Sequence, residues 1–420
     1  MTGASASAPQ ESSKTSKIAP HPSVRSLVLA LVVALLASVA FLEFGLFRYI
    51  VTVDNFPLAA YDAGNQILKY WPDQSGIRYP DRDRRHPVNY SINDDGWNSV
   101  HPSYAQTRNA RRRIAVIGDS FVEAFQVRPA QSVAARLETL LGPTANEVYS
   151  FGISGAALSQ YLHVARYVAR TFHPDAIVVI VVHNDFIESY RPKPATFSKS
   201  FLRLDVGGGG GQAVREVTPL PYGRRPVAQW LLARSATVRF GFYMWRTLLE
   251  RTAESPRPPG HRTARFEANI DVTELDGEQP HIERAAGYLF DQFAQLERST
   301  HTRVLFAMDC PREALYAGKD PRALDVYRLN RLASAEARRA GLSLIDLTEA
   351  FVEDYRRFGK RFDFSNDNHW NAHGHDVVAH ELARRLTAEA SPSPGLAGPL
   401  ADPVGSAGLR TVAAPSESAP

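Results

Sequence analysis

Runs of apolar residues alternate along the chain with segments in which apolar and polar positions recur at helical spacing. The apolar runs are short, continuous and rich in β-branched residues, which is typical of strands buried on both faces of a parallel sheet. Five strands are predicted, at residues 114–117, 147–151, 176–182, 303–308 and 342–347. Because helical segments separate them, the pattern predicts an α/β fold, a three-layer α/β/α sandwich around a five-stranded parallel sheet.

The helical segments have apolar residues at spacings of three and four. The clearest runs from Leu158 to Phe172 and is followed by the helix breaker His173-Pro174-Asp175. Further helices are predicted at 129–141, 282–298 and 321–340, and a last one after Gly374. No internal repeat interrupts this order.

The N-terminal block is more apolar than any part of the predicted domain. Residues 24–47 contain an uncharged run, Ser26 to Leu42, close to the length that crosses a bilayer. Lys14, Lys17 and Arg25 precede it, so the positive-inside rule predicts a cytoplasmic N-terminus and an extracytoplasmic remainder, periplasmic or at the cell surface.

A cleavable signal peptide is the alternative to this single-pass membrane anchor. Ser38-Val39-Ala40 has the small-residue pattern of a cleavage site, but the apolar block continues beyond it, which favours an uncleaved anchor. Residues 1–23 and 389–420 are small or polar without apolar periodicity, so both tails are predicted to be disordered.

Between the anchor and the domain at 111–388, residues 48–110 are rich in aromatic and turn-forming residues. They predict an irregular extracytoplasmic stem, in which Tyr90, Trp97 and Tyr104 serve as core anchors or, alternatively, as a glycan-contacting wall. A second irregular region, about 186–276, interrupts the domain as an insertion. Its helical pattern at Val227 to Leu249 predicts a helix that packs on the domain, covers the site or rests on the membrane surface.

Charge and cysteine content narrow the function classes. The net charge is +4, but the basic residues are scattered and the one short run, Arg111 to Arg113, lacks interleaved aromatic residues, so nucleic-acid binding is not expected. The single cysteine, Cys310, excludes an internal disulfide and any cysteine-based zinc site, and is expected to pack at a strand end.

The candidate chemistry begins at the end of the first strand of the sheet. Ser120 follows Gly118 and Asp119 there, and ligands of parallel sheets bind beyond the carboxyl ends of the strands. A serine nucleophile needs a base and an acid that orients the base. Asp367 and His369 are two residues apart and can point to the same side of an extended segment, with Asp363 as a second candidate acid.

Four blocks of the sequence, in this order and spacing, resemble those of the SGNH (GDSL-like) hydrolase superfamily. They are GDSF at 118–121, FGISG at 151–155, HND at 183–185 and DNHWNAHGH at 367–375. The resemblance covers about residues 114–386, and the N-terminal anchor and stem resemble the membrane-anchored bacterial members. Four ordered blocks are a far more specific signal than one GDS motif.

The resemblance implies a role for each matching residue. Ser120 would be the nucleophile, His369 the base and Asp367 its partner, while the Ser120 backbone N–H, Gly152 and Asn184 would form the oxyanion hole. Two positions depart from the pattern: His183 stands where glycine is usual, which is expected to narrow the pocket, and one residue rather than two separates Asp367 from His369.

The resemblance implies a serine esterase or deacylase that removes an acyl group, such as acetyl, from a glycan or lipid through an acyl-enzyme. Two alternatives stay open: an O-acyltransferase that modifies an exported polysaccharide with the same residues, and a non-catalytic binding or assembly protein that keeps the fold. No cofactor is expected, and no metal, because His369, His373 and His375 lack a second ligand cluster. The sequence indicates no protein partner.

Overall fold

The computed structural model describes residues 23–80, 86–192, 198–207, 213–222, 226–253, 265–268, 270–365 and 367–390. The predicted disordered tails lie outside the described residues at 1–22 and 391–420, and so does most of the glycine run 207–211. Residues 389–390, predicted as tail, end the last helix instead.

The five predicted strands form one parallel sheet. They are β5 (Arg112–Gly118), β6 (Asn146–Gly152), β7 (Ala176–Val181), β12 (Arg303–Met308) and β13 (Ser343–Asp346), in the spatial order β13-β12-β7-β5-β6. The predicted strand bounds agree with these to within two residues, and the predicted fold class is confirmed. β5 is an inner strand, so its carboxyl end lies between those of β6 and β7.

Successive side chains along each strand point to opposite faces of the sheet, and those on the two faces belong to two different hydrophobic clusters. On β5, Ala115 and Ile117 join one cluster, with side chains of the helices α4 (Leu158–Phe172), α8 (Val272–Thr300) and α10 (Arg328–Ala340). Ile114 and Val116 join the other, with side chains of α3 (Val133–Leu141), α11 (Thr348–Phe358) and α12 (Ala372–Ala390). Both sides of the sheet are therefore covered by helices, which explains the continuous apolar runs of its strands.

The covering helices are α3 (Val133–Leu141), α4 (Leu158–Phe172), α8 (Val272–Thr300), α10 (Arg328–Ala340), α11 (Thr348–Phe358) and α12 (Ala372–Ala390). Three differ from the predicted bounds. α3 begins four residues after the predicted start, behind the 3-10 turn η2 (Pro129–Gln131). α8 begins ten residues before the predicted start and contains Pro280, and α10 is preceded by two short 3-10 turns in place of one long helix. α11 was not predicted, although Phe351, Val352 and Tyr355 recur along it at helical spacing.

The stem contains two antiparallel hairpins, β1 (Ala59–Asp62) with β2 (Ile67–Tyr70) and β3 (Gln74–Arg78) with β4 (Val88–Ile92). Its aromatic residues Tyr90, Trp97 and Tyr104 are buried and belong to the α4-side hydrophobic cluster. The core-anchor interpretation of these three residues is confirmed, and the stem shares one core with the sheet.

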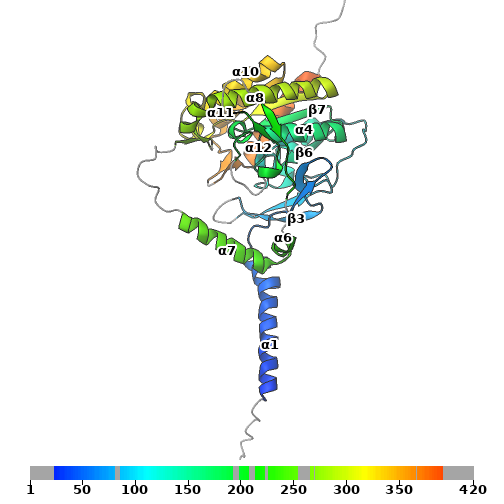
Figure 1. Cartoon of the computed structure of the whole chain (residues 1–420), viewed down its shortest axis with the longest axis vertical. Helices are drawn as coiled ribbons and strands as arrows, with labels where there is room; N and C mark the ends of the chain where they lie inside the picture. Colours follow the sequence, from blue (N-terminus) through cyan, green and yellow to red (C-terminus); the bar gives the residue numbers. More distant parts are fainter. Residues whose placement is uncertain are drawn as a thin grey trace, which may run out of the picture.

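At the N-terminus, α1 (Val24–Phe41) continues into the π-helix η1 (Leu42–Ile50) and projects as an isolated rod from the foot of the domain (Figure 1). It is the one helix of the described residues that is long and apolar enough to cross a membrane, and none of its apolar window is buried. Together the two segments make about 40 Å of helix.

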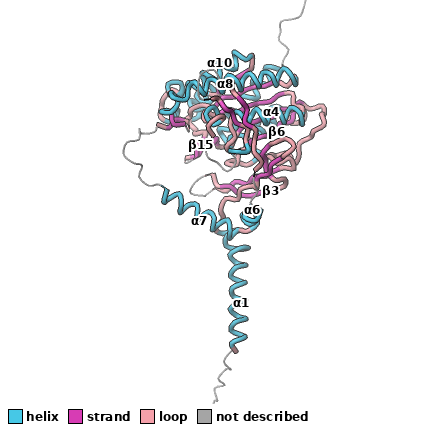
Figure 2. Tube along the Cα trace, viewed as in Figure 1, coloured by secondary structure: helices cyan, strands magenta, loops and turns pink. Residues whose placement is uncertain are grey.

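The insertion at 186–276 adds α5 (Asp185–Glu188) at its border and the hairpins β8 (Arg203–Asp205) with β9 (Arg215–Val217) and β10 (Phe266–Glu267) with β11 (Ile270–Asp271). The predicted helix at 227–249 is two helices, α6 (Pro226–Arg234) and α7 (Ala236–Ala253), broken at Ser235. Both lie at the foot of the domain beside the upper end of α1 (Figure 2).

Candidate active site

Ser120 begins a single helical turn directly after β5. This turn, α2 (Ser120–Glu123), is capped by Asp119, whose carboxylate accepts a hydrogen bond from the Phe121 N–H at 2.9 Å, and it ends at Ala124 in the left-handed conformation (φ 57°). Because Asp119 performs the capping, the Ser120 hydroxyl is not used to hold the turn.

Ser120, His369 and Asp367 form one hydrogen-bonded chain. The Nε2 atom of His369 lies 2.7 Å from the Ser120 Oγ, and its Nδ1 atom contacts the Asp367 carboxylate. The same carboxylate oxygen accepts the His369 backbone N–H at 3.0 Å, so a segment with one intervening residue holds the acid and the imidazole together. The predicted pair thus lies on β15 (Asp367–Trp370), opposite the serine turn.

The environment of Asp367 favours its charged form. Burial by itself would raise the pKa of this carboxyl, but hydrogen bonds from the His369 ring and backbone, the charge of His369 and the nearby Arg78 guanidinium outweigh burial and lower the pKa. The carboxylate is therefore ionised at neutral pH and can orient and stabilise an imidazolium.

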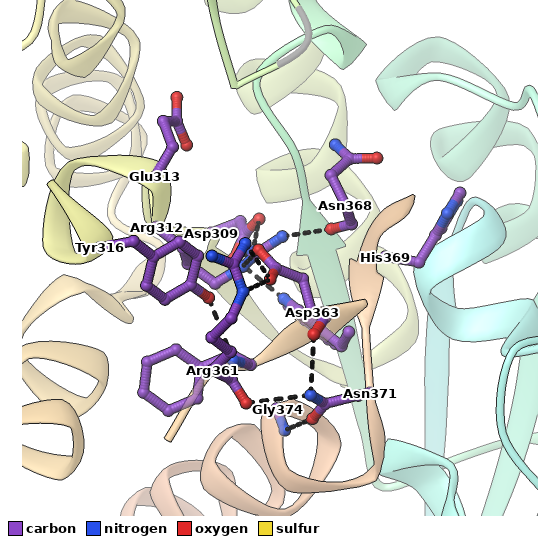
Figure 3. Close-up of polar contacts among 12 residues, drawn as sticks. Asp309, Arg312, Glu313, Tyr316, Arg361, Asp363, Asn368, His369, Asn371 and Gly374 are labelled. Atoms are coloured by element: carbon purple, nitrogen blue, oxygen red, sulfur yellow. Dashed lines mark hydrogen bonds and ion pairs between the residues drawn. The ribbon is translucent and has the colours of Figure 1, made fainter. Parts of the chain in front are cut away.

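Asp363, the second candidate acid, is held elsewhere. Its carboxylate pairs with Arg361 at 2.9 Å and lies 4.0 Å from the Nε of Arg312. Figure 3 shows Asp363 within this arginine cluster, while the His369 ring points away from it. Of the two acids, the structure brings Asp367 to the histidine.

A buried ion pair supports the Asp367–His369 segment from behind. Arg312 contacts both carboxylate oxygens of Asp309, and its Nη2 donates at 2.5 Å to the carbonyl of Asn368, the residue between the acid and the base (Figure 3). Trp370 Nε1 donates to Asp309 at 3.2 Å. Sequence reasoning missed this pair, although both members directly follow β12, at the edge of the sheet where the site was predicted.

Gly152 ends β6 beside the serine turn. A Cβ atom at this position would lie 2.0 Å from the Glu123 backbone nitrogen and 2.5 Å from the Val122 carbonyl carbon. The end of β6 therefore packs directly on α2, and a glycine is needed because any side chain would displace that turn.

Asn184 follows the carboxyl end of β7 and borders the site there. It precedes α5, lines the cavity described below, and donates its side-chain amide to the Glu188 carboxylate at 3.1 Å. An amide nitrogen carries two hydrogens, so this contact fixes the group and leaves one donor.

The residues on either side of Asn184, His183 and Asp185, are buried and hydrogen-bonded within the protein. Asp185 is buried and accepts hydrogen bonds from the Val182 N–H at 2.8 Å and the Tyr161 hydroxyl at 2.9 Å, and burial raises its pKa well above the usual range. His183 is also buried, with its Nε2 2.9 Å from the Asn330 side-chain oxygen.

A cavity of about 500 Å³ borders the site, lined by Asp367 and by Phe121 and Asn368, the chain neighbours of Ser120 and His369. Asn184 and His183 also lie on its wall, and Phe266 and Phe364 add apolar surface. Phe266 belongs to β10, so the end of the insertion contributes to this cavity. The predicted strand-end packing of Cys310 is confirmed, because the residue is buried after β12.

The stem reaches the other side of the serine turn. Tyr70 and Ser154 donate their hydroxyls to the buried carboxylate of Glu123, and the Asn98 amide donates to the Glu123 carbonyl at 2.7 Å. Burial raises the pKa of Glu123. The last residue of α2 is thus tied to the stem.

The three histidines of the final block have different contacts. His369 contacts Ser120, His373 pairs with Asp354 at 2.7 Å, and His375 is buried edge-on against Trp370, where burial lowers its pKa to about 3. Among the residues that the structure describes, no group of three or more His, Cys, Asp or Glu side chains is arranged to hold a metal ion.

Residues 116–377 match the GDSL-like Lipase/Acylhydrolase family. The chain belongs to this family. The match spans more than half of the sequence and contains the serine, the aspartate and the histidine described above. This GDSL-like protein is therefore a serine hydrolase of ester bonds, of the SGNH superfamily.

Solved structures similar to this hydrolase share little sequence with it. A lipolytic G-D-S-L family protein from Veillonella parvula DSM 2008 is 12% identical, with 66% of this chain and 98% of that chain covered and a TM-score of 0.34. An alpha/beta hydrolase from the metagenome of Lake Arreo, Spain, is 15% identical, with 68% and 100% covered and a TM-score of 0.36. An acetyl xylan esterase is 13% identical, with 65% and 99% covered and a TM-score of 0.34. Among curated proteins, none matches the chain.

Proposed function

We propose that this protein is a membrane-anchored, extracytoplasmic esterase that removes an acyl group, such as acetyl, from a glycan or lipid. The observation that carries the proposal is the 2.7 Å contact between His369 Nε2 and Ser120 Oγ, continued to the ionised Asp367. α1 is proposed as an uncleaved anchor, with the N-terminus in the cytoplasm, because residues 14–25 carry the cations and the helix is exposed along its length.

In the proposed reaction the Ser120 Oγ attacks the acyl carbonyl carbon, and its proton moves to His369 Nε2. The carbonyl oxygen becomes an oxyanion, which the Ser120 and Gly152 N–H groups and the Asn184 amide are proposed to bind. Losing one such donor typically costs about 3 kcal/mol of transition-state stabilisation. The ester C–O bond then breaks, the alcohol takes the proton from His369, and the acyl group stays on Ser120.

The second half of the reaction runs the same proton path in reverse. A water molecule gives its proton to His369 Nε2 and attacks the acyl-enzyme carbonyl, and collapse of the second tetrahedral intermediate returns the proton to Ser120 and releases the carboxylic acid. Asp367 stays charged throughout and stabilises the imidazolium formed in each half.

The test is hydrolysis of p-nitrophenyl acetate by the full-length protein in detergent, together with labelling by a fluorophosphonate. We expect Ser120→Ala to lose turnover and labelling. Ser343→Ala, at the amino end of β13 and far from the carboxyl-end site, should keep both. Unchanged turnover or labelling in Ser120→Ala would contradict the proposal.

A further inference from the structure

α7 carries an apolar stripe on its surface. Val238, Phe242, Trp245 and Leu248 follow one another at spacings of four, three and three, which places them on one helical face. Their exposed fractions are 38%, 46%, 57% and 62%. Four large apolar side chains in a row, all exposed, are unusual for a surface that water covers.

α6 extends this surface. Val227, Trp230 and Leu231 occupy one face at spacings of three and four, and all three are exposed. We call the seven residues on the two helices the foot surface. It contains both exposed tryptophans of the insertion.

The opposite face of α7 is the one that packs on the protein. Ala236 is buried, and the Phe240 ring stacks on Phe47 of η1 with 4.2 Å between the centroids. Because the packed positions and the exposed stripe lie on opposite sides of the helix, the α7 part of the foot surface faces away from the chain.

The N-terminus of α7 is attached to the end of the apolar rod. The Glu43 carboxylate accepts hydrogen bonds from the Ser235 hydroxyl at 2.8 Å and from the Ala236 and Thr237 N–H groups at 2.9 and 3.1 Å. Arg48 donates to the Arg234 carbonyl at 3.1 Å, so the α6–α7 turn is held at the point where the rod enters the domain (Figure 1). A carboxylate at a helix N-terminus also stabilises the helix dipole.

Three arginines lie at this turn. Arg48 pairs with Glu43 at 3.1 Å, Arg239 donates to the Ala233 carbonyl at 2.8 Å, and the Arg234 guanidinium lies over the Trp230 ring at 5.7 Å from its centroid. Tryptophan, apolar side chains and arginine together are the composition that binds the boundary between phospholipid headgroups and acyl chains. Arginine is suited to the phosphate groups there.

We propose that the foot surface lies in the membrane into which α1 inserts, on the leaflet that faces the catalytic domain, with anionic phospholipid headgroups at the arginines. This inference rests on the proposed anchoring by α1. The protein would then be attached at two points, by a helix across the bilayer and by a hairpin along its surface. Two attachments limit the rotation of the domain about the anchor.

The test uses the full-length protein in vesicles of phosphatidylethanolamine and phosphatidylglycerol. Trp245→Cys carries a nitroxide label in a chain whose buried Cys310 is replaced by serine. The depth of the label is read from the ratio of its relaxation by oxygen to that by a water-soluble nickel complex. We expect a ratio severalfold higher at position 245 than at Phe358→Cys, an equally exposed position on α11.

A third label, at Leu31→Cys in the middle of α1, separates the two proposals. If the Leu31 label lies in the bilayer and the Trp245 label relaxes like the Phe358 label, the foot surface is in water and this inference is wrong while the anchor stands. If the Leu31 label is in water, the anchor itself fails. A Trp245 label shielded only by a second copy would show spectral broadening that disappears on dilution with unlabelled protein, and that result would also overturn the inference.

Discussion

At the scale of single residues, the acid partner of His369 is set by position more than by residue type. Asp363 and Asp367 are both near the cavity, but Asp367 contacts the imidazole and Asp363 is paired with Arg361. Removing the charge at the two positions should therefore have different effects.

We predict that Asp367→Asn lowers kcat for p-nitrophenyl acetate by roughly ten-thousand-fold, because the imidazole loses its orienting and stabilising charge. Asp363→Asn is the matched control and should stay within about tenfold of the parent, an effect on loop position only. Steady-state kinetics of both variants measure this. An equal or larger loss in Asp363→Asn would assign the acid role to that residue.

At the scale of elements, the site depends on how closely the end of β6 approaches the serine turn. Gly152 has no room for a side chain, whereas Gly287 in α8 has only ordinary contacts, the nearest being Glu336 at 3.6 Å from an added Cβ. The same substitution at these two glycines should thus give opposite results.

We predict that Gly152→Ala displaces α2, lowers the Tm and removes most esterase activity, since the added Cβ would overlap the Glu123 backbone. Gly287→Ala should keep activity and stabilise the protein by up to about 1 kcal/mol, because alanine is the better helix former. Thermal unfolding and ester hydrolysis provide the readouts. Full activity in Gly152→Ala would show that the turn can move without loss.

A second element, the β14–β15 hairpin (Asp363–Phe364 with Asp367–Trp370), depends on the buried Arg312–Asp309 pair. We predict that Arg312→Ala destabilises the protein by about 3–5 kcal/mol, because it leaves the Asp309 charge buried and unpaired. Arg322→Ala, which breaks an exposed pair with Glu349, should cost no more than about 1 kcal/mol. Urea unfolding of both variants tests the difference, and similar losses would argue against a supporting role for Arg312.

At the scale of the whole molecule, two buried groups make stability depend on pH in opposite directions. The pKa of His375 falls from 6.5 to about 3 on folding, so the unfolded chain takes up a proton that the folded chain does not, and stability falls as pH drops below 6.5. The pKa of Asp119 rises from 3.8 to about 6, chiefly through burial, so its contribution falls as pH rises from 3.8 to 6.

We predict that His375→Phe removes the first of these effects. Between pH 6.5 and 4.5 the parent protein should lose stability relative to the variant by up to about 1.4 kcal/mol per pH unit, while above pH 7 the difference should be constant. Urea unfolding at pH 7.5, 6.5, 5.5 and 4.5 measures it. A constant difference over the whole range would mean that His375 takes up its proton at the same pH in the folded and the unfolded protein.

The strands of the sheet were predictable because a strand buried on both faces needs a continuous apolar run, and each run ends where a polar residue or turn begins. Ser120, Asp367 and His369 were predictable for a related reason. Ser120 follows the carboxyl end of a predicted strand, and Asp367 and His369 lie just before the last helix, in blocks that match a known family. α11 was missed although Phe351, Val352 and Tyr355 follow helical spacing, so the sequence did carry a signal for it.

The sequence by itself determined the alternation of strands and helices, the apolar N-terminal helix and the residue types of the site, because these depend on local spacing and composition. The sequence favoured Asp367 over Asp363 as the partner of His369, and the folded chain shows why: Asp363 is paired with Arg361, whereas Asp367 contacts the imidazole. Only the tertiary structure decided the support by Arg312 and the tie between Glu43 and α7, which join residues 56 and 193 positions apart. Contacts at such separations follow from the packing of whole elements, which no local pattern records.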